Sequence, residues 1–262
     1  MNFIELLEHS KVHKSIIDEF EQWVTHLKDI KGYSINTYKS YCYDICDFFI
    51  FYQFYHQESL SLFNLDKLDL QTFRAWVADL GSTRDYVNVY KKPLSARSRR
   101  RAISSLKNYL KFSSIKNPDY KSGFSELQLL KNPKIPKSLP KPISEEQIDQ
   151  LIDQLTKISK KKWIQKRNLA LLYLLYGCGL RINEALSITK NHLTDKNSLK
   201  IMGKGNKERL IPILEIVYRS LENYLNELPY NISNDQLIFV GDRGSPLKAS
   251  AFQRDLKQAR IN

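Results

Sequence analysis

The stretch YGCGLRINEALSITKNHLTDKNSLKIMGKGNKERLIPI, residues 176–213, decides how the second half of this chain folds. Gly177 and Gly179 end an apolar helix, and Arg181 follows them at the start of a shorter one. Residues 198–202 and 208–213 read as two short strands, and a Gly-Lys-Gly-Asn turn carrying Lys204 joins them. The sequence therefore predicts a helix, a glycine corner with an arginine, a second helix and a hairpin with a lysine at its tip.

Three side chains in this stretch have the chemistry for phosphoryl transfer without a metal ion. The planar fork of Arg181 can hold two phosphate oxygens at once, and Glu184, one helical turn later, can fix that fork in place. Lys204 between two glycines can reach into a groove and protonate a leaving oxygen. Each feature alone is common in purely structural roles, and the stretch lacks the frame of a nucleotide-binding P-loop. Their order, helix-then-hairpin context and basic surroundings favour the functional interpretation.

Positive charge is concentrated in two blocks rather than spread along the chain. The formal net charge is +13, and residues 84–111 hold nine Lys or Arg against one acid. Residues 157–209 hold thirteen against three. A generally basic soluble protein would also carry this charge, but two separate blocks favour a polyanion held between two surfaces. We therefore expect double-stranded DNA as a partner.

Residues 1–115 are expected to form a helical DNA-binding domain. Apolar residues recur at helical spacing, and Ser34, Asp69 and Ser95 stand where helix N-caps are needed. The aromatic stripe of the second helix has a helical period, so it predicts core rather than a base-stacking platform. The helix after Ser95 buries one apolar face and turns its basic side chains outward. These basic side chains, predicted to contact DNA, are Arg97, Arg99, Arg100, Arg101 and Lys107.

The pattern changes at residue 116. Residues 116–143 hold five prolines and six lysines without periodicity, which predicts an extended basic linker. A second domain, residues 144–262, begins with a capping box from Ser144 to Gln147 and includes the hairpin and later helices around residues 214–228 and 249–259. The expected fold class is mainly α with a small antiparallel β-sheet.

The remaining composition argues against several other classes. The three cysteines, Cys42, Cys46 and Cys178, show no CxxC spacing and no nearby histidine at ligand spacing. We therefore expect a reducing compartment, no disulfide framework, no metal site and no cofactor. The N-terminus MNFIELLEHS is acidic where a signal peptide is basic, and the longest apolar run is too short to span a bilayer. These features predict a cytoplasmic protein without a membrane partner.

Several motifs resemble those of the tyrosine recombinases, and most closely the bacterial Xer recombinases. LRINEAL and GKGNKERLIPI resemble the first half of that family's active site. SARSRRRAISSLKNYLKF resembles the family's helical core-binding domain, and KSLPKPISEEQIDQL its interdomain linker. The resemblance extends from about residue 14 to residue 260. It implies a SAM-like core-binding domain followed by an α+β catalytic domain that is incomplete here.

The resemblance also implies a chemistry and a set of partners. Arg181 and Lys204 correspond to catalytic residues, Glu184 supports them, and Lys207 and Arg209 join the DNA-binding set. In this family a tyrosine attacks a DNA phosphate, which gives a covalent phosphotyrosine and a free 5′-hydroxyl, and the partner strand then re-ligates. The family role is resolution of chromosome dimers at cell division, by a heterotetramer of two related recombinases with a septal DNA translocase.

The sequence departs from the family pattern after Lys204. The family's His-x-x-Arg box does not follow, and the last histidine is His192. The last tyrosines, Tyr218, Tyr224 and Tyr230, fit ordinary helix and turn positions, so we expect no nucleophile among them. We expect a Xer-like recombinase truncated at its C-terminus that does not cleave DNA as this chain. The alternatives are a non-catalytic DNA-binding remnant and a phage- or integron-type integrase.

Overall fold

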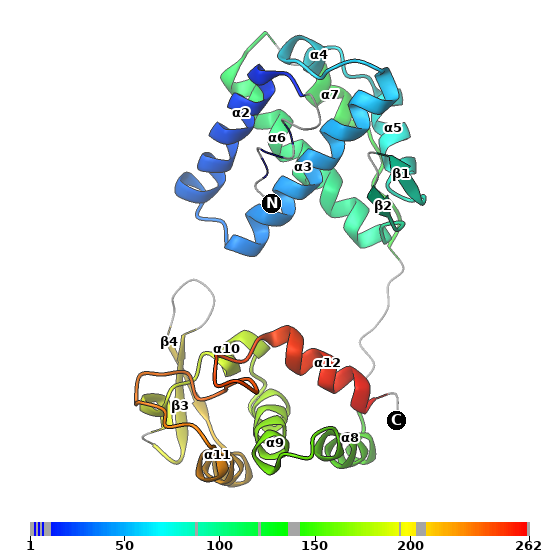
Figure 1. The fold of residues 1–262 in the computed structure, drawn as a ribbon. Helices are drawn as coiled ribbons and strands as arrows, with labels where there is room; N and C mark the ends of the chain where they lie inside the picture. The colour runs from blue at the N-terminus through cyan, green and yellow to red at the C-terminus, as the bar shows by residue number, and fades with distance from the viewer. Residues whose placement is uncertain are drawn as a thin grey trace. The chain divides into compact units, whose positions relative to one another are not determined.

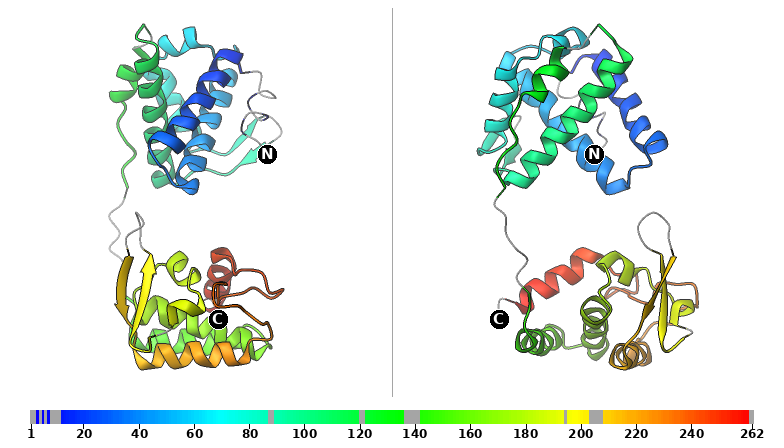
Figure 2. Two further views of the ribbon diagram at one scale, coloured as in Figure 1. Left: turned by 90° about the vertical axis from the view of Figure 1, so that its left-hand side faces the viewer. Right: turned by 180° about the vertical axis from the view of Figure 1, so that it is seen from behind.

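The computed structural model describes residues 3, 5, 7, 12–86, 89–119, 122–135, 142–193, 195–202 and 208–260. The chain divides into two compact units, Met1–Leu139 and Pro140–Asn262 (Figures 1 and 2). The fold class agrees with the sequence-based expectation, because helices dominate and each β-sheet seen in the described residues is a two-stranded antiparallel ribbon. No helix in the described part of the chain is long and apolar enough to cross a membrane.

The described part of the first unit is helical apart from a short hairpin. Its elements are α2 (Lys14–Thr25), a π-helical turn (His26–Ile30), α3 (Ile35–His56), α4 (Leu62–Asp66), α5 (Leu70–Asp79), β1 (Arg84–Tyr86), β2 (Val89–Lys91), α6 (Ala96–Lys116) and α7 (Ser122–Gln128).

The expected helix starts of the first unit are confirmed. The side chain of Ser34 accepts a hydrogen bond from the Thr37 N–H, Asp69 from Thr72 at 2.7 Å, and Ser95 from Ser98. Each cap satisfies one of the N–H groups that the first helical turn leaves without a partner.

The core of the first unit lies between α3 and α6. Phe48 and Phe49 of α3 are fully buried and contact the rings of Trp76 and Tyr109, respectively, edge to face. The aromatic stripe is therefore core, as its helical period predicted. Cys42 lies in the same core, and burial raises the pKa of its thiol to about 12, so it acts as a small apolar side chain.

The predicted extended linker is wrong for Ser122–Gln128, which form α7. Leu127 and Leu130 are buried in the first core, and Phe124 packs against it. Gly123 allows α7 to approach α4 closely, because a Cβ at this position would lie 2.4 Å from the Leu65 carbonyl oxygen. Apolar residues three apart thus anchor this segment to the first unit despite the surrounding prolines and lysines. Residues 136–141 of the predicted linker lie outside the described residues.

The second unit combines helices with a hairpin. Its elements are α8 (Glu145–Lys157), α9 (Lys162–Gly177), α10 (Ile182–Leu186), a 3-10 turn (Lys190–Leu193), β3 (Ser198–Met202), β4 (Glu208–Pro212), α11 (Glu215–Glu227) and α12 (Ala249–Ala259).

Helix α9 is the centre of the second unit. It lies between α8 and α11, and α12 crosses α8 (Figure 1). The predicted capping box at the start of α8 is confirmed, since the Ser144 hydroxyl and the Gln147 side chain each accept the other residue's N–H. Buried polar contacts of Arg167 connect α9 to later parts of the chain. Arg167 donates to the Val240 carbonyl at 3.0 Å and pairs with Asp255 of α12.

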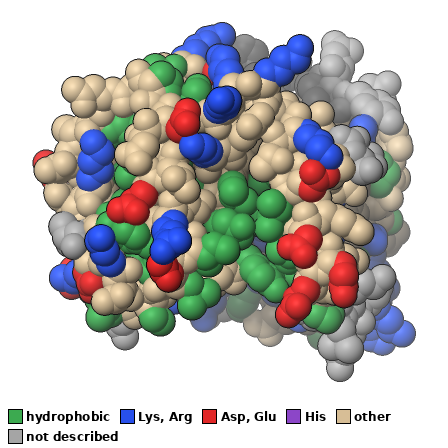
Figure 3. All heavy atoms as spheres, turned by 90° about the horizontal axis from the view of Figure 1, so that it is seen from below, with side chains coloured by type: hydrophobic (Ala, Val, Ile, Leu, Met, Phe, Trp, Pro, Cys, Tyr) green, Lys and Arg blue, Asp and Glu red, His purple; other side chains and the backbone are tan. Residues whose placement is uncertain are grey.

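One face of the second unit carries an apolar hollow. Hydrophobic side chains gather on the face formed by α8, α9 and α11, with charged side chains around them (Figure 3). Between α9 and α11 the surface is hollowed by about 370 Å³ and lined by Leu169, Tyr173 and Ile216 among others. None of the predicted site residues that the structure describes lines this hollow.

Candidate functional site

The glycine corner predicted from the sequence places Arg181 at the N-terminus of α10. Gly179 adopts φ of 62°, a left-handed conformation that favours glycine and lets the chain turn sharply after α9. Arg181 is then the N-cap residue of α10, with extended backbone. Its main-chain N–H donates to Glu184 Oε2 at 2.8 Å, so the carboxylate one turn later satisfies the donor at the helix start.

Glu184 is the centre of the site. Its side chain is only 9% exposed, and it contacts two arginines from different elements. Arg181 Nη1 donates to Oε1 at 2.9 Å, and Arg209 Nη2 donates to Oε2 at 2.8 Å. Burial by itself raises the pKa of Glu184, but the Arg181 N–H and the two guanidinium groups outweigh burial, so its pKa lies below the ordinary value. Glu184 is therefore an anion held between two cations.

Arg181 keeps most of its guanidinium available to a ligand. Its side chain is 69% exposed, and only Nη1 is engaged by Glu184. The N–H groups of the fork that Glu184 does not use can donate to anionic oxygens. Glu184 thus holds one end of the Arg181 guanidinium, and the other end is accessible to an anion. Arg181 can therefore stabilise negative charge on a phosphate.

The hairpin forms at the predicted position, between β3 and β4. The predicted strands are confirmed, with Ile201 opposite Arg209 and Leu199 opposite Ile211. Directly opposite residues share one face of an antiparallel ribbon, and Leu199 and Ile201 are buried, so Arg209 lies on the core-facing side. Lys200 pairs instead with Glu208 at 2.6 Å. Lys204 and Lys207 fall between the two strands, outside the described residues.

The tyrosines and the histidine that follow Arg181 make contacts within the second unit. Tyr224 is fully buried, donates to the Ile238 carbonyl at 2.8 Å and stacks on Phe239. Burial raises the pKa of the Tyr224 hydroxyl to about 12. Tyr230 donates to the Asp242 carbonyl, and burial raises the pKa of Tyr218. His192 Nδ1 accepts from the Thr189 N–H at 3.0 Å.

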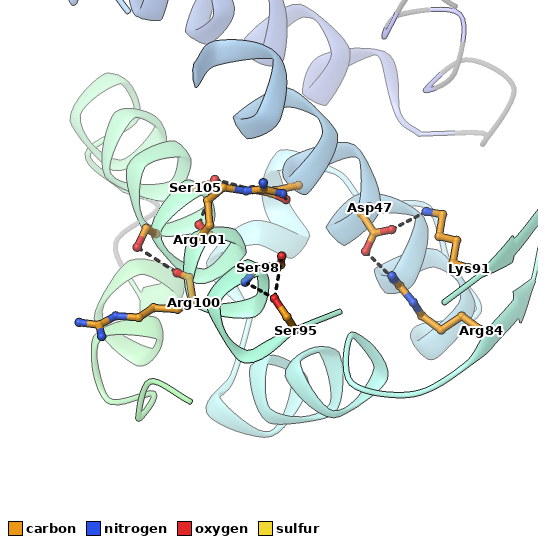
Figure 4. Close-up of polar contacts among 10 residues, drawn as sticks. Asp47, Arg84, Lys91, Ser95, Ser98, Arg100, Arg101 and Ser105 are labelled. Atoms are coloured by element: carbon orange, nitrogen blue, oxygen red, sulfur yellow. Dashed lines mark hydrogen bonds and ion pairs between the residues drawn. The ribbon is translucent and has the colours of Figure 1, made fainter. Parts of the chain in front are cut away.

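The basic block of the first unit is partly neutralised by acids of α3 (Figure 4). Arg101 donates to both oxygens of Asp44, at 2.9 and 2.8 Å, and Ser105 donates to the same carboxylate. Asp47 pairs with Arg84 at 2.6 Å and with Lys91, which binds the β1–β2 hairpin to α3. These pairs hold elements together.

The other predicted DNA contacts of this block differ in exposure. Arg97 and Arg100 are exposed on α6, whereas Arg99 and Lys107 are half-buried. The side chain of Arg99 lies over Gly81, because a Cβ added at Gly81 would be 2.7 Å from Arg99 Nη1. The first turns of α6 therefore offer Arg97 and Arg100 as the most accessible of the predicted set.

Sequence reasoning missed the two carboxylates that organise this surface. Asp44 and Asp47 stand three apart on α3, inside the buried aromatic stripe YCYDICDFF. An acid on a buried helix face needs a partner, and the nearby basic block supplies several. Acids within a buried helix face, together with a nearby basic block, were therefore the sequence signal that could have predicted these ion pairs.

Comparison with known proteins gives a consistent result for both units. Residues 20–115 match the "Phage integrase, N-terminal SAM-like domain" model, and residues 141–262 match the "Phage integrase family" model. The chain is 37% identical over 237 residues to tyrosine recombinase XerC of Rickettsia bellii, and covers 90% of its own length and 73% of that protein. It is 36% identical to tyrosine recombinase XerC of Rickettsia typhi, over 92% of its own length and 75% of that protein.

Solved structures show the same fold. The XerH site-specific recombinase bound to palindromic difH matches with a TM-score of 0.63 at 20% identity, over 93% of this chain and 68% of that one. A lambda integrase tetramer bound to a Holliday junction matches with a TM-score of 0.65 at 13% identity, over 94% and 65%. From its domain matches and its XerC relatives, the chain belongs to the phage integrase family of site-specific tyrosine recombinases.

Proposed function

We propose that this chain acts in Xer-type site-specific recombination, in which chromosome dimers are resolved at cell division. In this proposal it binds duplex DNA in the cytoplasm, beside a related recombinase in a heterotetramer and with a septal DNA translocase. The similarity to XerC proteins supports the Xer assignment over a phage- or integron-type integrase. The DNA-bound state of XerH and lambda integrase supports duplex DNA as the partner.

The observation that carries the proposal is the geometry at the start of α10. Arg181 is 69% exposed, and the buried carboxylate of Glu184 fixes one end of its fork. We assign to Arg181 the binding of a DNA phosphate and to Glu184 its support. Lys204 is assigned protonation of the leaving 5′-oxygen on its position in the sequence. Residues 1–115 are assigned to DNA binding and 144–262 to catalysis, and residues 116–143 to the connection except for α7, which packs on the first unit.

The polypeptide of these 262 residues is proposed not to cleave DNA by itself. Covalent catalysis needs an activated hydroxyl, and two of the three later tyrosines use theirs in hydrogen bonds within the fold. Tyr224 is part of the core, and the Tyr230 hydroxyl donates to a main-chain carbonyl. This observation also favours the second candidate function, a protein that occupies a DNA site without cutting it.

The experiment that tests this proposal uses a nicked suicide substrate. An active tyrosine recombinase would be trapped on such DNA as a covalent adduct, visible as a shifted band after denaturing electrophoresis. We expect the 262-residue chain to bind the duplex in a gel-shift assay and to give no adduct. Absence of DNA binding would refute the proposed function. An adduct would refute only the loss of cleavage, and peptide mapping would identify the tyrosine.

A further inference from the structure

Arg209 differs from the other described basic residue of the hairpin in where its side chain goes. It stands opposite Ile201, which is buried, so both share the core-facing side of the ribbon. Lys200 is opposite the exposed Leu210 and lies on the other face. The sequence predicted Arg209 as a DNA contact because it belongs to the second basic block. The register instead directs it towards α10.

The contact that Arg209 makes there is shared with Arg181. Glu184 Oε2 accepts from Arg209 Nη2 at 2.8 Å and from the Arg181 N–H at 2.8 Å. The other oxygen, Oε1, accepts from Arg181 Nη1 at 2.9 Å. Two donors from different elements therefore hold Oε2 in place. This fixes the orientation of the carboxylate, and with it the position of Oε1 relative to the Arg181 guanidinium.

Removal of Arg209 would leave the orientation of the Glu184 carboxylate less well determined. Oε2 would keep only the main-chain bond at the helix start, and the half-released carboxylate could rotate about its last side-chain torsion, which is broad. Arg181 has a side chain that is 69% exposed, and among the described residues Glu184 is the side chain that holds its fork. A fork that is free to rotate loses the pre-orientation that makes two hydrogen bonds to a phosphate favourable.

We propose that Arg209 is a positioning residue, which acts through Glu184 to orient the guanidinium of Arg181 towards a DNA phosphate. The inference rests on the proposed function, in which Arg181 binds that phosphate. It also assigns a structural role to the hairpin, because Arg209 links β4 to the start of α10 near the end of the strand pair that leads into the turn with Lys204. A direct contact between Arg209 and DNA is the competing explanation.

A double-mutant cycle on DNA affinity separates the two explanations. The four proteins are the parent chain, Arg181→Ala, Arg209→Ala and the double variant, titrated with one mixed-sequence duplex at fixed salt. Arg181→Ala should weaken binding about tenfold, as expected for loss of a charge-assisted hydrogen bond to phosphate. Arg209→Ala should weaken binding about threefold to tenfold in the parent, but by less than about twofold when Arg181 is already Ala.

Lys200→Ala is the matched control. It removes one cation from the same hairpin and leaves Glu184 untouched, so its effect should be the same with and without Arg181. Arg209→Gln, which keeps an amide donor, serves as a second variant if Arg209→Ala unfolds. A nitrogen-15 NMR spectrum of the arginine side chains adds a direct signature. The Arg181 Nε–H resonance should shift in Arg209→Ala and stay in place in Lys200→Ala.

The outcomes are distinguishable. Weakening by Arg209→Ala that is equal in both backgrounds would mean an independent DNA contact, and it would overturn the positioning role while the proposed function stands. An unchanged Arg181 resonance in Arg209→Ala would overturn it as well. If Arg181→Ala binds DNA as tightly as the parent chain, the phosphate role of Arg181 fails, and the inference fails with it.

Discussion

At the residue scale, Glu184 determines how Arg181 can be interpreted. A buried carboxylate is costly unless it is paired and hydrogen-bonded, and Glu184 meets both conditions through Arg181 and Arg209. The pairing with Arg181 is asymmetric, because Glu184 is buried and Arg181 is exposed. Glu184 therefore depends on its partners for stability, whereas the Arg181 guanidinium can be solvated or bind an anion.

This asymmetry predicts a small effect of Arg181→Ala on folding. The Arg181 main-chain N–H still caps α10 through Glu184, and Arg209 still neutralises the carboxylate. We expect a loss of about 0.5–1 kcal/mol in the free energy of unfolding, typical of an exposed ion pair. Urea unfolding measures it, with Arg219→Ala, another exposed arginine that pairs with a glutamate, as the control. A loss above about 3 kcal/mol would make Arg181 a structural residue and weaken its functional assignment.

Glu184 also predicts a pH dependence of stability. Its folded-state pKa lies below the ordinary value of 4.5, so the ionised form stabilises the fold above that value. This contribution is lost as the pH falls through the folded-state pKa. Glu184→Gln should be less stable than the parent chain at neutral pH, and the difference should shrink below about pH 4.5. A difference that stays constant in urea unfolding from pH 7 to pH 3, roughly, would contradict the charge-based explanation.

At the scale of elements, the β1–β2 hairpin depends on one carboxylate of α3. Asp47 binds Arg84, whose side chain is 3% exposed, and Lys91, which stands directly opposite Arg84 on the other strand. Because the two partners sit on opposite strands, Asp47 fixes the hairpin against α3 more firmly than either pair would alone. The hairpin holds the segment that leads into α6, which carries the exposed Arg97 and Arg100.

Asp47→Asn should therefore be costly. It removes the shorter of the two carboxylate pairs of the deeply buried Arg84, at 2.6 Å, and keeps the pair to Asp79, at 3.5 Å. Loss of one partner from a buried pair destabilises by about 3–5 kcal/mol, and the remaining pair lowers our expectation to about 2–4 kcal/mol. Asp153→Asn is the control, because Asp153 is 55% exposed in an i,i+4 pair with Lys157 and should cost at most about 0.5 kcal/mol. Equal effects in thermal melting would show that burial does not govern the Asp47 pairs.

The elements that the sequence predicted correctly are those fixed by local signals. The N-caps at Ser34, Asp69 and Ser95, the capping box at Ser144 and the two strands β3 and β4 each depend on neighbouring residues. The missed elements depend on distant partners. Helix α7 is held by the core of the first unit, and the β1–β2 hairpin by Asp47 of α3. At the site, the Arg181–Glu184 pair is local, whereas the Arg209 contact spans the whole hairpin and needed the strand register.

At the scale of the whole molecule, net charge overstates the number of cations available to DNA. In the first block, Arg84, Lys91 and Arg101 are paired with acids of α3. In the second block, Lys157, Lys161 and Lys166 are each paired with an acid. A cation that already has a carboxylate partner gains less from a phosphate, because the existing pair must be broken first. DNA binding should therefore depend on a minority of the basic residues.

The salt dependence of DNA binding tests this selectivity. If about six phosphates are neutralised, log K should fall with log salt with a slope near −5. Replacement of Arg97 and Arg100 by Ala should bring the slope closer to zero by about 2, because each exposed cation releases about one counterion.

The matched control replaces Lys157 and Arg219, which removes the same charge from residues already paired with acids. Its slope should change by less than about 1. Equal changes in the two variants would show that DNA responds to total charge, and a parent slope near zero would remove the argument for a basic DNA-binding surface.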